Sequence, residues 1–128
     1  MTMGRFAIHQ YTDPPAHYDI TVDRGDRVAV FRIEQFDMLA LLDGTEVTAG
    51  MIEDAGFGQA PPGEPISCGR CMVRLFDDGS CGIERWDPPV YIFHIAGRQF
   101  YGTLHVLKAK EGYSLRYVRN RAKRPAAR

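Results

Sequence analysis

The sequence predicts a small all-β domain, folded as a closed or nearly closed antiparallel barrel. Short, mostly apolar runs recur along the chain, and Gly, Asp and Pro clusters separate them. Helical periodicity is hard to find. Short strands at regular spacing are typical of sandwiches and barrels. A barrel is favoured because it removes the exposed strand edges that a chain without covering helices would otherwise leave open.

The apolar runs and the turn signals between them give the expected strands in order. They cover Arg5–Gln10, His17–Val22, Arg27–Ile33, Glu46–Ile52, Cys71–Phe76, Cys81–Trp86, Val90–Ala96, Gln99–Leu107 and Tyr113–Val118. Asp77–Ser80 predicts a hairpin turn. Phe36–Leu42 is continuously apolar and fits either a buried strand or a short helix. The many Gly and Pro residues of Gly56–Gly69 predict a long ordered loop.

The length of 128 residues fits one domain. We expect a barrel over residues 1–119 and a flexible basic tail over 120–128. No run reaches the ~18 apolar residues of a transmembrane helix. The start of the chain has no apolar signal-like segment, and the three cysteines are an odd number. We therefore expect a cytoplasmic protein that is not bound to a membrane.

The net charge is zero, but positive charge is concentrated at the C-terminus. Six bases and no acid follow Glu111, whereas the chain up to and including Glu111 contains sixteen acids and ten bases. Such a tail can bind nucleic-acid phosphates or remain a solvated end. The candidate nucleic-acid-binding residues are Arg70, Arg74, Arg121, Lys123 and Arg124.

The strand that carries His17-Tyr18-Asp19 holds the richest chemistry. Alternate strand residues face the same way, so His17 and Asp19 share one face. His9 and Tyr11 share a face of the preceding strand, and pairing of the two strands would bring the four side chains together. Imidazole beside carboxylate suits Mn²⁺ or Zn²⁺, general acid–base catalysis, or a structural hydrogen bond.

This stretch resembles the start of the 3′-phosphoesterase domain of bacterial DNA ligase D, where an F-x-I-x-x-H segment precedes an H-Y-D-x-R strand. Phe6, Ile8 and His17-Tyr18-Asp19 keep that spacing. Pro61–Glu64 and Phe93–Gly102 are similar to later motifs of the family. The resemblance implies a β-barrel that repairs nucleic-acid 3′ ends with a metal held by two His and an Asp.

Carried over to this chain, the resemblance makes His17 and Asp19 two metal ligands. Tyr11 stands in place of the family's first His ligand, and Thr21 in place of its phosphate-binding Arg. His9 is the residue available to fill in as a ligand. An active site would thus have catalytic His17, Asp19 and Tyr11, with His17, Asp19 and His9 on the metal.

The lost family residues leave two functions open. One is a metal-dependent 3′-phosphoesterase with an altered site. The other is a non-catalytic module on the same barrel, which binds nucleic-acid 3′ ends or a repair protein. The cysteines leave further alternatives: Cys68-x-x-Cys71 and Cys81 fit a zinc site, a redox pair, or two turn cysteines and one core cysteine.

Overall fold

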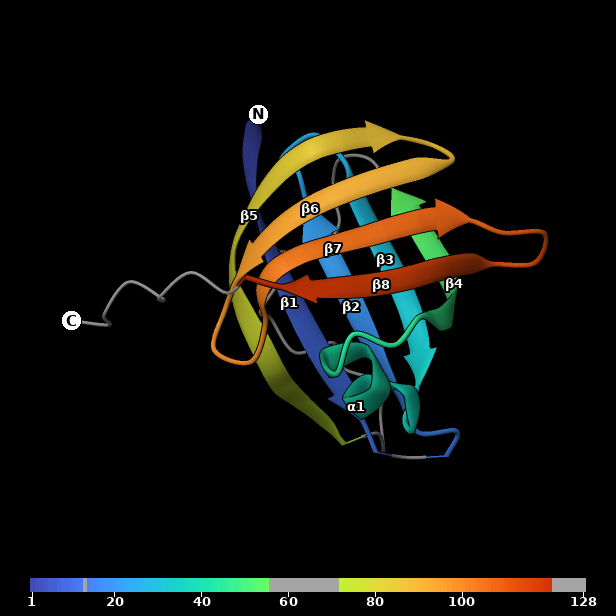
Figure 1. Ribbon diagram of the computed structural model, residues 1–128. Coiled ribbons are helices and arrows are strands. Elements are labelled where there is room, and N and C mark those ends of the chain that lie inside the picture. Colours follow the sequence, from blue (N-terminus) through green and yellow to red (C-terminus); the bar gives the residue numbers. More distant parts are fainter. Residues whose placement is uncertain (13, 56–71, 121–128) are drawn as a thin grey trace.

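Eight antiparallel strands close into a barrel in the computed structural model, which describes residues 1–12, 14–55 and 72–120 (Figure 1). The elements are β1 Thr2–Tyr11, β2 His17–Asp23, β3 Val28–Glu34, α1 Asp37–Leu42, β4 Val47–Ala55, β5 Val73–Asp87, β6 Val90–Ala96, β7 Tyr101–Lys108 and β8 Tyr113–Arg119. Around the barrel the order is β1-β2-β3-β4-β8-β7-β6-β5, and β5 pairs with β1 to close it. The predicted fold class is confirmed.

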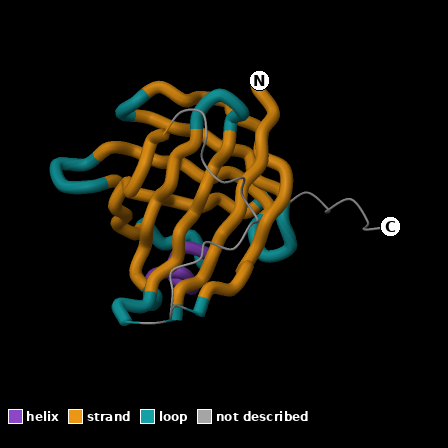
Figure 2. The backbone as a smooth tube through the Cα atoms, turned by 180° about the vertical axis from the view of Figure 1, so that it is seen from behind, coloured by secondary structure: helices purple, strands orange, loops and turns teal. Residues whose placement is uncertain are grey.

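Alternation along the strands fills the barrel with apolar side chains. Phe6 and Ile8 on β1, Ile20 on β2 and Phe31 on β3 all belong to one buried core. Burying a side chain of this kind stabilises the fold by about 1.5–3 kcal/mol. Residues between these positions point outward because successive strand residues face opposite sides. Figure 2 shows from behind that the strands continue around the barrel.

The predicted hairpin turn at Asp77–Ser80 is wrong, because β5 passes straight through it as one 15-residue strand. Pairing with β1 continues along this stretch, with a register shift at Ile8/His9. Gly79 lies against β6 so closely that a Cβ there would be 1.9 Å from the carbonyl oxygen of Ala96. The glycine therefore permits a close approach between strands, and it does not mark a turn.

Asp77 also has a structural role that its turn-like sequence hides. Its carboxylate is buried and accepts hydrogen bonds from the successive backbone N–H groups of Arg98, Gln99 and Phe100, at 2.7–3.0 Å. These residues form the connection between β6 and β7. An acid expected to make a local turn thus holds together a connection more than twenty residues away.

The apolar run after β3 forms the short helix α1, which decides between the two predicted alternatives. Met38 and Leu41 are buried, whereas Phe36 and Leu39 are exposed. The helix contacts β3, β4 and β8 and lies at one end of the barrel (Figure 1). No helix in the described part of the chain is long and apolar enough to cross a membrane. The predicted Gly56–Gly69 loop lies outside the described residues, as does the tail beyond residue 120.

Candidate functional site

Pairing of β1 with β2 brings the four predicted polar side chains together. His9 lies directly opposite Asp19, and Tyr11 lies directly opposite His17. Because Ile8 belongs to the core, its strand neighbour His9 points outward, and the other three share that outer face. The convergence expected from strand periodicity is therefore present.

These outward side chains are nevertheless buried. The exposed fractions are 4% for His9, 7% for Tyr11 and 5% for Asp19. Burial of a polar group costs free energy unless a hydrogen bond or an opposite charge compensates for it. The partners of each polar atom therefore decide what this site can do.

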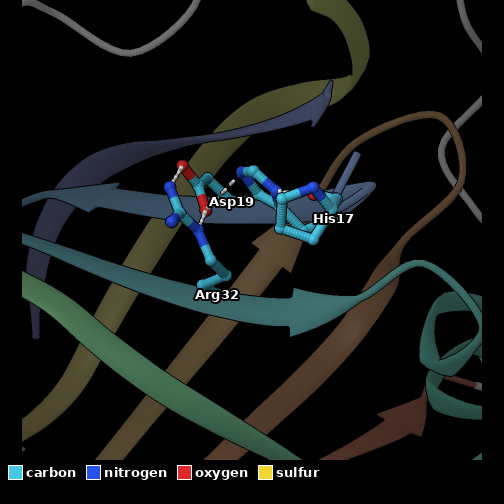
Figure 3. Close-up of polar contacts among 4 residues, drawn as sticks. His17, Asp19 and Arg32 are labelled. Carbon is cyan, nitrogen blue, oxygen red and sulfur yellow. Dashed lines mark hydrogen bonds and ion pairs between the residues drawn. The ribbon is translucent and has the colours of Figure 1, made fainter. Parts of the chain in front are cut away.

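The carboxylate of Asp19 is held by Arg32, which lies directly opposite it on β3. Arg32 Nε donates to Asp19 Oδ1 at 2.8 Å, and Nη2 donates to Oδ2 at 3.1 Å (Figure 3). A two-pronged contact of this kind is among the strongest polar interactions in proteins. The hydrogen bond to Asp19 raises the pKa of Arg32 against the opposing effect of burial.

His17 has a defined proton position. Its Nδ1 lies 2.7 Å from the carbonyl oxygen of Pro15, which only accepts, so Nδ1 carries a proton, and Nε2 is an acceptor when the imidazole is neutral. Nε2 is 3.9 Å from Asp19 Oδ1, too far for a hydrogen bond. Within the described residues this buried Nε2 has no hydrogen-bond partner. The Tyr11 ring stacks on the imidazole, with centroids 4.5 Å apart and planes at 15°.

The second imidazole, that of His9, is also buried with its Nε2 unpartnered among the residues described. Burial lowers the pKa of His9, and the charges of Asp19 and Asp78 oppose that shift only in part. Burial also raises the pKa of Tyr11, as does the Asp19 carboxylate. The site therefore contains a neutral imidazole and a protonated phenol around one ion pair.

These residues do not fit the metal centre that the family resemblance implies. Two imidazole nitrogens are available as donors, but both oxygens of Asp19 are taken by a guanidinium, whose positive charge opposes a cation. Tyr11 presents a stacked ring where a third ligand is expected. In the described ranges, no three His, Cys, Asp or Glu side chains are placed to hold one ion.

A cavity of about 610 Å³ opens beside this cluster, with His17 and Arg32 in its wall. Its volume is in the range of sites that bind small molecules. Its lining residues come from the β1–β2 connection and the start of β2, from β3, α1 and β4, and from the β7–β8 turn. The charged and hydroxyl-bearing residues that line it are His17, Arg32, Glu34, Asp37, Thr48 and Glu111.

The predicted nucleic-acid-binding residues are not brought to this cluster where the structure describes them. Arg74 lies opposite Gln10 on β1, and Gln10 alternates with His9 and Tyr11. Arg74 therefore occupies the other face of the sheet. The remaining members of that set lie outside the described residues: Arg70, Arg121, Lys123 and Arg124.

Two further residues, Cys81 and His94, have contacts that are typical of structural roles. Cys81 is a core residue, and burial raises the pKa of its thiol to about 12. The other two cysteines, Cys68 and Cys71, lie outside the described residues. The zinc and redox alternatives therefore stay predictions. His94 forms hydrogen bonds with Glu84 at 2.7 Å and Thr103 at 3.1 Å, which is the bonding expected of a structural histidine.

Sequence reasoning missed Arg32 and the cavity carboxylates. The three-residue turn expected at Arg24–Asp26 would pair Asp19 with Phe31, whereas the turn closes between Arg24 and Arg27 and pairs Asp19 with Arg32. The carboxylates come from three separate elements, and no spacing in the sequence links them. A scan against protein-family models and a search of curated proteins return no match for this chain.

Proposed function

We propose that this chain is a divergent relative of the 3′-phosphoesterase domain of DNA ligase D, in which the metal-dependent site has become a binding site. The barrel then serves as a non-catalytic module linked to nucleic-acid end processing or DNA repair. The bidentate ion pair between Asp19 and Arg32 carries this proposal, because it commits the retained carboxylate to a protein cation.

Two substitutions relative to the family pattern support the loss of catalysis. Metal-assisted phosphate hydrolysis needs ligands that hold a cation and a cationic group that binds the phosphate. Tyr11 replaces a ligand and packs against His17. Thr21 replaces the phosphate-binding Arg. Arg32 does not take over that role because its guanidinium group is hydrogen-bonded to Asp19.

The proposal is tested by phosphate release from a 3′-phosphorylated primer–template in the presence of Mn²⁺ or Zn²⁺. We expect the wild-type protein to release no more phosphate than the His17→Ala variant. An active 3′-phosphatase on the same substrate is the positive control. Release that His17→Ala abolishes would show that the protein is a phosphoesterase and would overturn the proposal.

Calorimetric titration with Mn²⁺ and Zn²⁺ gives an independent readout. We expect no stoichiometric binding by the wild type and a gain of binding by the double variant Tyr11→His/Arg32→Leu, which supplies an imidazole and frees the Asp19 carboxylate. Tyr11→Phe/Arg32→Leu is the matched control, since it frees the carboxylate without adding a ligand. Wild-type binding that His9→Ala removes would instead support the enzyme with His9 as the substitute ligand.

A further inference from the structure

We draw no further inference here: the strongest candidate, the groove on the outer face of β7 and β8 where Leu107 and Val118 are half exposed beside Arg116, carries none, because nothing in the described part of the chain shows what covers it.

Discussion

Asp19 on β2 and Asp77 on β5 are two carboxylates of nearly equal burial, with exposed fractions of 5% and 3%. Asp77 accepts hydrogen bonds from three backbone N–H groups of the β6–β7 connection and from its neighbour Asp78. Asp19 is bound instead by one side chain, that of Arg32, and it lies opposite or beside imidazoles whose Nε2 atoms are unpartnered in the described part of the chain.

This contrast separates structural from functional use of a buried acid. Around Asp77 every acceptor faces backbone donors that the fold places there, so removing the acid leaves those donors unsatisfied. Around Asp19 two imidazole Nε2 atoms lack hydrogen-bond partners among the described residues, and unsatisfied groups of this kind concentrate at binding and catalytic sites. The sequence motif that resembles an active site thus coincides with the less satisfied of the two acids.

The largest expected effect comes from Asp77→Ala. Loss of the carboxylate leaves three turn N–H groups without acceptors, and each buried unsatisfied group costs about 1–3 kcal/mol. We expect the free energy of unfolding to fall by about 3–5 kcal/mol, measured by urea denaturation. Asp78→Ala is the control, because the Asp78 side chain is 41% exposed and its contact with Arg5 spans 4.0 Å. Equal losses in the two variants would show that Asp77 has no special role.

A smaller effect is expected from Arg32→Leu, which leaves the Asp19 carboxylate buried without its cation. Breaking a fully buried pair costs about 3–5 kcal/mol, but Arg32 is 42% exposed, so we expect a loss of about 1–2 kcal/mol. Asp19→Asn combined with Arg32→Leu should recover part of that loss. Arg116→Leu, which breaks an exposed 3.9 Å contact with Glu46, is the matched control.

A double variant no more stable than Arg32→Leu alone would mean that the two residues do not interact. That result would remove the ion pair as the feature that distinguishes Asp19 from Asp77, and with it the main support for a changed site. The same urea measurements therefore test both the energetics and the functional proposal.

Local patterns were sufficient for the pairing of His17 with Asp19 and for most of the barrel. Alternation alone places His17 with Asp19, and the turn signal at Arg24–Asp26 correctly locates the β2–β3 hairpin. The turn is one residue longer than that signal, so counting outward from the signal places Phe31 opposite Asp19, where the structure has Arg32. Strand boundaries such as Val90–Ala96 coincide with the apolar run that predicts them.

The remainder depended on contacts between residues far apart in the chain. Asp77–Ser80 has a strong local turn signal, but Asp77 satisfies the connection after β6 and Gly79 accommodates the neighbouring strand. Tertiary contacts overrode the local preference there. The cavity likewise combines Glu34 with Glu111, and no local pattern links positions so far apart.

The smallest expected effect is a pH dependence that arises at His9. Because burial lowers its pKa in the folded state below the ordinary value of 6.5, the unfolded chain binds more protons as the pH falls below that value. The contribution of His9 to stability is therefore complete above pH 6.5 and decreases as the pH falls through the lowered pKa. His9→Gln should reduce the slope of unfolding free energy against pH between pH 7.5 and about pH 5, where histidine titrates.

The control is His105→Gln, at an exposed position on β7, which keeps the contribution of His9. An unchanged slope in His9→Gln would show that this imidazole is not held neutral by burial, and the unsatisfied surroundings of Asp19 would then have to be explained without it.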